Sequence, residues 1–220
     1  MNFQITPVHI FAGIVALAAV VTGLVYYTAY LRRKKLGELA ASMGLLYSEE
    51  GPDIGLLQGT GLEIFGYGHT RKAINMIESS TSAGPMRVFD YTYVTGSGKH
   101  RNSHSYTVAL VDCPQVTVPH FDLKPENFLY KIGEFIGFKD IDLPGFPIFS
   151  DKYRLTGSDE AAVQAFFNPG RAAWFERNLG MYVQGARNHV LLFKREGALP
   201  ADAWQGFIEE VKVFAAEVLK

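Results

Sequence analysis

The sequence has almost no cysteine, and it has no acidic residue before Glu38. Cys113 is the only cysteine among 220 residues, which excludes a disulfide within the chain and fits a reducing compartment. Four of the 21 basic residues lie at 32–35, which leaves 17 basic against 22 acidic residues over 36–220. This acidic excess argues against a broad nucleic-acid-binding surface, so no nucleic-acid partner is expected.

Formally charged side chains are also absent from residues 8–30, VHIFAGIVALAAVVTGLVYYTAY. As a helix this stretch would extend about 35 Å, enough to cross a hydrocarbon layer of about 30 Å. Tyr26, Tyr27 and Tyr30 lie where aromatic side chains gather at a membrane interface. The pattern predicts a transmembrane helix over residues 8–30. A cleaved signal peptide fits less well, because the first seven residues carry no basic side chain and the apolar run is long.

A basic run follows the apolar stretch, at Arg32, Arg33, Lys34 and Lys35. Cationic residues next to a membrane span stay preferentially on the cytoplasmic side. The run therefore predicts an inner-membrane protein with its N-terminus outside and the rest of the chain in the cytoplasm. These cations either bind anionic lipid head groups or serve only as a stop and orientation signal.

These patterns predict four parts in the chain. They are a short extracytoplasmic N-terminus at 1–7, a transmembrane helix at 8–30, a basic juxtamembrane helix at 31–50 and a cytoplasmic domain at 51–220. Apolar residues recur at helical spacing from Leu36 to Leu46, which predicts that the helix continues until Gly51 ends it. The whole chain is 48% hydrophobic, and a folded core is expected.

The clearest pattern in the domain predicts a long β-hairpin. Residues 87–94 and 104–112 alternate apolar and polar side chains, and a glycine-bearing polar loop at 95–103 joins them. Further strands are expected at 62–68, 72–78 and 151–157, with a second hairpin at 181–194. Helices are expected at 125–137, at 158–167 with Ser158 as its cap, and at 199–220. The expected fold is therefore α+β, with an antiparallel sheet packed by helices.

One short string resembles a catalytic motif. HFDLKPEN, residues 120–127, differs from the kinase loop H-R-D-L-K-P-E-N by having Phe121 in place of arginine. In that motif Asp122 would accept the substrate proton and Asn127 would bind a metal ion. Fewer than fifty residues separate Lys72 from the string, too few for the rest of a kinase N-lobe. The likeness is therefore interpreted as coincidental, with residues 119–125 forming a connector.

The remaining candidates are surface and core side chains. Lys99, His100 and Arg101, in the loop of the predicted hairpin, either contact a partner or head groups or are simply solvated. His100 and His104 would lie about 13 Å apart in an extended chain, too far to share one metal ion. Cys113 is interpreted as a buried structural thiol rather than a nucleophile. No catalytic residue, metal or cofactor is predicted.

The order of features resembles a group of bacterial single-span membrane-anchored proteins of unknown function. The resemblance rests on the membrane helix and basic stop, on MRVFDYTYVTGSGKHRNSHSYTVALV at 86–111, and on FPIFSDKYRLTGSDEAAVQAFFNP at 146–169. It implies a bacterial origin and supplies no catalytic residues.

Two classes of function remain open on the sequence. The favoured one is a membrane-anchored interaction module, such as an accessory subunit of a membrane protein complex, with the bilayer and a membrane protein as partners. The alternative is a membrane-surface enzyme or a small-ligand- or lipid-binding domain, which a deep pocket around His104, His120, Asp122 or Cys113 would favour.

Overall fold

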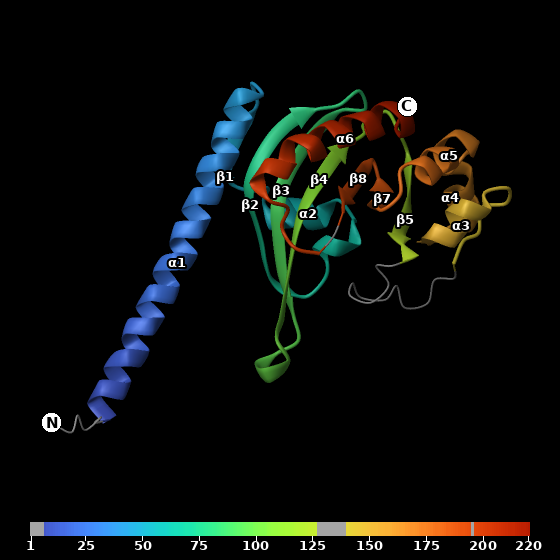
Figure 1. Ribbon diagram of the computed structural model, residues 1–220. Coiled ribbons are helices and arrows are strands. Elements are labelled where there is room, and N and C mark those ends of the chain that lie inside the picture. Colours follow the sequence, from blue (N-terminus) through green and yellow to red (C-terminus); the bar gives the residue numbers. More distant parts are fainter. Residues whose placement is uncertain (1–6, 127–139, 195) are drawn as a thin grey trace.

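A long helix leads into a folded α+β domain (Figure 1). The computed structural model describes residues 7–126, 140–194 and 196–220. The predicted helix at 125–137 lies almost wholly outside the described residues. The predicted fold class is confirmed: an eight-stranded antiparallel sheet is packed by helices, and the apolar helix precedes it.

Helix α1 runs from Pro7 to Ser42 and contains the predicted membrane span. It is long and apolar enough to cross a membrane, and its most apolar stretch is not buried within the protein. Only its last two turns enter the core, through Leu36 and Ala40. The helix ends earlier than predicted, because Gly44 adopts a left-handed φ of 68° and turns the chain. Residues 46–50 are therefore not helical.

The sheet has the strand order β1-β2-β3-β4-β8-β7-β5-β6. Its strands are β1 (Leu46–Glu50), β2 (His69–Ser80), β3 (Pro85–Thr95), β4 (Asn102–Asp112), β5 (Val118–Pro125), β6 (Tyr153–Gly157), β7 (Tyr182–Arg187) and β8 (His189–Phe193). Each neighbouring pair is antiparallel. Strands β1 to β4 follow one another in the sheet in sequence order. The β7–β8 hairpin is inserted between β4 and β5, which are consecutive in the sequence.

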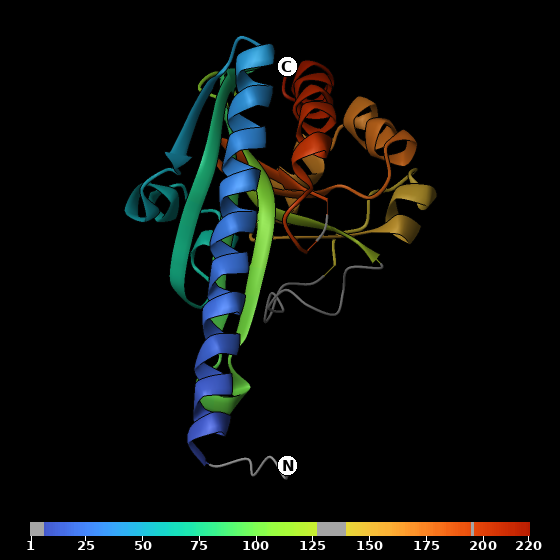
Figure 2. The same cartoon turned by 60° about the vertical axis from the view of Figure 1, so that its left-hand side comes forward.

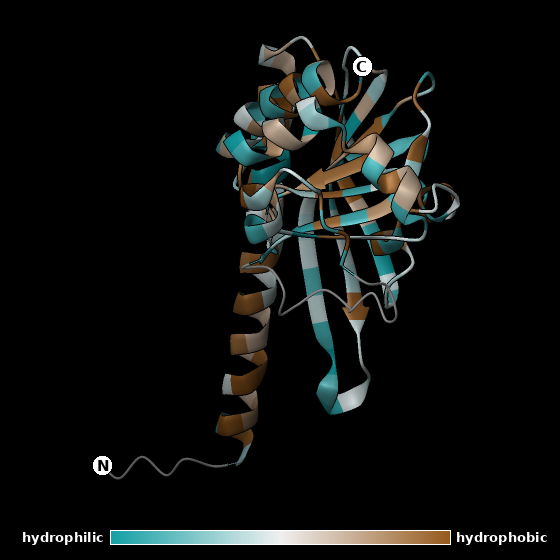
Figure 3. Ribbon diagram, turned by 90° about the vertical axis from the view of Figure 1, so that its right-hand side faces the viewer, coloured by the Kyte–Doolittle hydropathy of each residue, from teal (hydrophilic) through white to brown (hydrophobic). Residues whose placement is uncertain are grey.

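The remaining elements cover the two faces of the sheet. They are α2 (Ile54–Gly59), η1 (Glu63–Phe65), η2 (Gly98–His100), α3 (Pro147–Lys152), α4 (Glu160–Phe166), α5 (Pro169–Arg177), η4 (Ala201–Ala203) and α6 (Trp204–Val218). One core cluster lies between the sheet and the end of α1, α3–α5 and α6. The other lies under α2 and η1. Figure 2 shows α6 beside the C-terminal half of α1, and Figure 3 shows the apolar half of α1 extending away from the domain.

The β3–β4 hairpin follows its predicted register and faces. Arg87 pairs with Leu110, and Thr95 pairs with Asn102. Successive side chains of a strand point to opposite faces of the sheet, so those of β3 and β4 enter the two core clusters alternately. The aromatic face packs under η1, with Phe65 meeting Tyr91 edge to face at 5.1 Å between ring centroids.

Three local predictions are wrong for identifiable reasons. The segment 62–68 is not a strand, because glycines turn the chain after η1; a Cβ at Gly68 would lie 2.2 Å from the carbonyl oxygen of Val94. Strand β2 begins at His69, three residues before the strand predicted at 72–78. Helix α4 is capped by Asp159 rather than Ser158, since the Asp159 carboxylate accepts from the Ala162 N–H at 3.0 Å.

The segment 119–125 is a strand and not a connector. Strand β5 pairs with β6 on one side and β7 on the other, so both edges of its backbone are hydrogen-bonded. Phe121 and Leu123 enter the core cluster of the α6 face, whereas Asp122 and Lys124 point to the opposite face.

Candidate functional site

The strongest polar feature joins the long helix to the sheet. Arg32, in α1, donates from Nε and Nη2 to the two carboxylate oxygens of Asp90 in β3, each at 2.8 Å. Asp90 is only 4% exposed. A bidentate guanidinium–carboxylate pair fixes both distance and orientation, and it is strong where water is excluded. We call this pair and its partners the helix–sheet junction.

Two neighbouring strands complete the hydrogen bonding of the buried carboxylate. The Asn75 amide in β2 donates to Asp90 Oδ2 at 2.9 Å, and the Thr107 hydroxyl in β4 donates to Oδ1 at 2.8 Å. Asp90 therefore accepts four hydrogen bonds, two at each oxygen. Asn75 has a left-handed φ of 56°, in a stretch where the β2–β3 register shifts. This backbone conformation is unfavourable for most residues and is tolerated best by glycine and asparagine.

The junction also reaches the segment before α6. The N–H of Leu199 donates to the Thr107 hydroxyl at 2.8 Å, and the Arg32 guanidinium lies 5.7 Å from the centre of the Trp204 ring. On the other side, the Tyr47 hydroxyl donates to the Asn75 amide oxygen at 3.0 Å. Burial is the main reason that the pKa of Tyr47 is raised. The end of α1 is thus tied to β1, to the middle of the sheet and to the start of the last helix.

The predicted membrane-interface residues do not all face outward. The Arg32 side chain forms an ion pair with Asp90, so it points into the domain and not toward the lipid. Arg33 pairs with Glu49 at 3.0 Å and Lys34 with Glu38 at 3.9 Å, both at the surface. Lys35 lines a groove of about 370 Å³ together with Thr28 and Pro200.

The predicted aromatic belt is exposed on α1. Tyr26, Tyr27 and Tyr30 are 74%, 58% and 59% exposed, respectively. They lie at the C-terminal end of the apolar stretch, just before Arg32 of the helix–sheet junction. Their contact with a membrane interface remains a prediction.

A second buried ion pair lies on the opposite face of the sheet. Lys124 Nζ is 2.9 Å from Asp122 Oδ2, and the two side chains are 10% and 1% exposed. The Gln184 amide donates to Asp122 Oδ1 at 3.2 Å, while its oxygen accepts from the N–H of Ile64 in η1. Lys124 also lies 5.7 Å from the centre of the Tyr182 ring. These contacts hold η1 against β5 and β7.

Three further ionisable side chains, Glu63, Tyr67 and His120, lie beside the Asp122–Lys124 pair. The Tyr67 hydroxyl donates to Glu63 at 2.9 Å, and His120 Nε2 lies 3.7 Å from the other Glu63 oxygen. Burial, more than any other cause, raises the pKa of Glu63, of Tyr67 and of Tyr182. The phenols therefore stay protonated: Tyr67 donates to Glu63, and the Tyr182 hydroxyl accepts from the Gln184 amide at 3.4 Å.

The kinase-like string has the wrong structural setting for its motif. Asp122 is buried in strand β5, which is paired on both sides, and lies against Lys124 rather than in an open loop that a substrate hydroxyl can reach. Asn127 lies outside the described residues. The geometry supports the interpretation that the string is coincidental.

The other histidines and the loop cations are dispersed. The two ring nitrogens of His104 are hydrogen-bonded to Thr95 at 2.8 Å and to Glu196 at 3.0 Å. Lys99, His100 and Arg101 are exposed at the hairpin tip. Across residues 7–126, 140–194 and 196–220, no three His, Cys, Asp or Glu side chains are arranged to hold a metal ion.

Cys113 is expected to resist thiol reagents in the folded protein. The thiol is fully buried, and burial raises its pKa to about 12. Compared with an ordinary thiol, roughly 10³-fold less thiolate is then present near neutral pH, in addition to the steric barrier. The measurement is the alkylation rate in detergent, with complete labelling only after denaturation. A Ser97→Cys variant, exposed at the hairpin tip, is the fast-reacting control; equal rates at the two positions would contradict the buried thiol.

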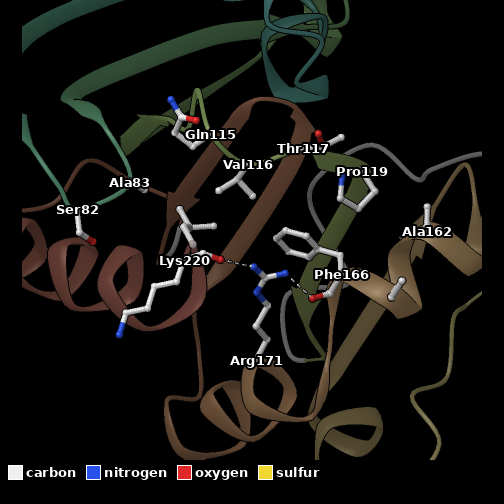
Figure 4. Close-up of a pocket in the computed structure, with 12 residues that line it drawn as sticks. Ser82, Ala83, Gln115, Val116, Thr117, Pro119, Ala162, Phe166, Arg171 and Lys220 are labelled. Atoms are coloured by element: carbon white, nitrogen blue, oxygen red, sulfur yellow. Dashed lines mark hydrogen bonds between the residues drawn. The ribbon is translucent and has the colours of Figure 1, made fainter.

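A groove is lined by the β2–β3 turn, the segment before β5, helices α4 and α5 and the end of the chain (Figure 4). Its volume is about 740 Å³, within the usual range for ligand sites. Arg171 donates from three nitrogens to main-chain oxygens of Val218, Phe166 and Lys220. Its guanidinium also lies 4.2 Å from the centre of the Phe166 ring. Arg171 thus joins α4 and α5 to the end of α6, and the rest of the lining is mainly small and apolar.

Comparisons with known proteins give a fold relationship. No family model matches the sequence, and none of the curated proteins matches it. The crystal structure of the mycobacterial trehalose monomycolate transport factor A, TtfA, is similar at 14% identity and a TM-score of 0.55. The likeness covers 83% of this chain and 92% of that chain. At this identity it shows a shared fold, and the site chemistry has to be argued from this chain's own residues.

Proposed function

We propose that this chain is a membrane-anchored accessory protein whose domain docks onto a membrane protein complex at the cytoplasmic face of the inner membrane. The observation that carries the proposal is the helix–sheet junction. An exposed apolar helix is joined to the domain by a buried bidentate ion pair instead of by a flexible linker. A helix held in this way presents the domain to the membrane surface at a fixed distance and orientation.

Fixed presentation suits an interaction module. A domain confined near a membrane partner has a high effective concentration, so a modest interface is sufficient for binding. The junction also restricts the domain's orientation, which lowers the entropy lost when it docks. A long flexible tether would provide the first advantage without the second.

The buried charges favour binding over catalysis. Both carboxylates that lie deep in the sheet already have intramolecular partners: Asp90 accepts from Arg32, Asn75 and Thr107, and Asp122 is paired with Lys124. Groups used in this way stabilise a fold and are not presented to a substrate.

A structural similarity and a sequence resemblance both support a membrane-anchored accessory protein. The fold is shared with a protein described as a transport factor, which is consistent with an accessory role at a membrane. The resemblance to bacterial single-span proteins points to the same arrangement of one helix and one domain.

The proposal is tested by isolating the full chain from its native membranes. We expect the chain to stay in the membrane after an alkaline carbonate wash, because the apolar face of α1 is exposed. After mild cross-linking and detergent extraction, we expect it to co-purify with at least one membrane protein. Extraction by carbonate, or a chain that always emerges alone after cross-linking, would contradict the proposal.

Two controls separate the helix from the domain and test orientation. Residues 1–35 fused to an unrelated soluble domain should reach the membrane but capture none of the same partners. If the fusion captures them equally well, recognition lies in the helix and not in the domain. A Ser97→Cys variant should stay unlabelled by a membrane-impermeant maleimide in intact cells and become labelled after lysis.

A further inference from the structure

The hairpin tip extends in the same direction as the apolar half of α1. Strands β3 and β4 continue beyond the sheet and end in η2, and in Figures 1, 2 and 3 this tip lies level with the N-terminal half of the helix. The views are related by rotation about the vertical axis, so their agreement in height is a property of the structure. The tip is therefore on the membrane side of the domain if α1 crosses the bilayer.

The two segments that form this end of the hairpin region are basic and contain no carboxylate. Residues 66–72 and 94–105 contain Arg71, Lys72, Lys99 and Arg101 and no aspartate or glutamate. Lys72, Lys99 and Arg101 are exposed. Among the described parts of the chain, none of these three cations has an ion-pair partner, and the neighbouring Glu196 is engaged by His104. We call residues 69–72 and 96–101 the basic tip.

The basic tip has a defined shape. His69 contacts the carbonyl oxygen of Gly96 at 2.9 Å, which ties the start of β2 to the turn. Gly96 has a φ of 70°, and a Cβ there would lie 2.2 Å from the carbonyl oxygen of His100. The turn therefore requires glycine and projects Lys99 and Arg101 outward from a narrow base.

Two constraints then fix where the tip can lie. The apolar half of α1 belongs in hydrocarbon, whereas ammonium and guanidinium groups are strongly disfavoured there. Since the tip is level with that half of the helix, α1 must cross the bilayer inclined away from the hairpin. Single transmembrane helices tilt by up to about 40°, and a tilt of α1 away from the hairpin moves the tip toward the head-group layer.

We propose that the basic tip is a second membrane contact, which binds the anionic head-group layer of the inner membrane through Lys72, Lys99 and Arg101. This inference rests on the proposed membrane anchoring. The partner is a surface of anionic phospholipid: the tip offers exposed positive charges from two segments, which suits a sheet of phosphates. Arg71 adds charge, while its own guanidinium donates to the carbonyl oxygens of Tyr67 and Gly66.

The test uses the full chain in lipid nanodiscs, with an environment-sensitive fluorophore on Ser97→Cys. In phosphatidylglycerol-containing discs we expect a blue-shifted emission and strong quenching by a nitroxide carried on the lipid head group. In discs of phosphatidylcholine alone the quenching should be weaker, because α1 still holds the tip near the surface but neutral head groups do not attract it. Lys99→Gln together with Arg101→Gln should weaken the contact roughly fivefold per cation. High salt should weaken it as well, because exposed charges are screened.

The matched control removes the same charge elsewhere. Lys212→Gln with Lys220→Gln changes two cations of α6 and the chain end, on the far side of the domain, and should leave the quenching unchanged. Equal quenching in neutral and anionic discs, or no effect of the tip variant, would overturn the proposal. Protection of the label in native membranes but not in anionic discs would also overturn it and would favour an acidic protein partner. Failure of the chain to enter discs at all would overturn the membrane anchoring itself, which separates the two conclusions.

Discussion

Asp90→Asn is expected to lower the free energy of unfolding by about 3–5 kcal/mol, the usual cost of breaking a buried ion pair from one side. The carboxylate is 4% exposed and each of its oxygens accepts two hydrogen bonds. An asparagine of the same shape would place an NH₂ group against two donors, whichever way the amide is turned. It would also leave the Arg32 guanidinium without a counter-charge.

The measurement is guanidinium unfolding of the full chain in detergent, followed by tryptophan fluorescence. The chain has two tryptophans, and Trp204 lies beneath the Arg32 guanidinium. Its emission should therefore report the junction before the rest of the domain unfolds. Glu209→Gln, which removes an exposed partner of Lys212, is the matched control and should change stability by less than about 1 kcal/mol.

A double-mutant cycle shows whether the loss belongs to the junction. Arg32→Gln alone should destabilise less than Asp90→Asn, because Asn75 and Thr107 still hydrogen-bond the carboxylate. Adding Arg32→Gln to Asp90→Asn should cost little more, since the pair is already broken. If the two losses simply add, the helix and the sheet are not coupled through this pair, and the argument for fixed presentation of the domain fails.

Elements with strong local patterns were predicted well from the sequence. The β3–β4 hairpin, strand β6, the β7–β8 hairpin and helix α6 all lie where the periodicity placed them. The buried side chains of α6 recur at helical spacing along one face: Trp204, Phe207, Ile208, Val211, Phe214, Ala215 and Val218. Here the side-chain pattern alone distinguishes the buried face from the exposed one.

Elements defined by distant partners were missed. Strand β1, LYSEE, is polar and short, and only pairing with β2 makes it a strand. Strand β5 carries Asp122 and Lys124 on one face, so it does not resemble a strand buried on both sides. Its neighbours β6 and β7 come more than twenty-five residues later in the chain, and no local pattern identifies them.

The junction was missed for a related reason. In RVFDYTYV the position of Asp90 alternates with aromatic residues, which is typical of a strand with a solvated face. Arg32 is one of four adjacent cations, and nothing in the sequence distinguishes it from the other three. Its position does so in the structure, because only Arg32 projects from α1 toward the middle of β3. A lone acid among the aromatic residues of a predicted hairpin strand, together with an unmatched cation run elsewhere, is the signal that could have suggested the pair.

Lys124→Met is the second substitution with a large expected effect. It should destabilise the domain by about 3–5 kcal/mol, since it leaves the Asp122 carboxylate buried without its counter-ion. Gln184 would then be the main hydrogen-bond donor to Asp122, at 3.2 Å. Guanidinium unfolding of the full chain in detergent measures this loss.

The double variant distinguishes a structural pair from a functional one. Asp122→Leu with Lys124→Met replaces both charges by apolar side chains of similar size, and such replacements are often neutral or stabilising. We expect the double variant to recover most of the stability lost in Lys124→Met and to keep its partners in the cross-linking experiment. A double variant that is stable yet captures no partner would show that this pair serves recognition, and the docking surface would then include η1. A double variant as unstable as the single one would show that the hydrogen bonds of Gln184, and not the ion pair, hold η1 on the sheet.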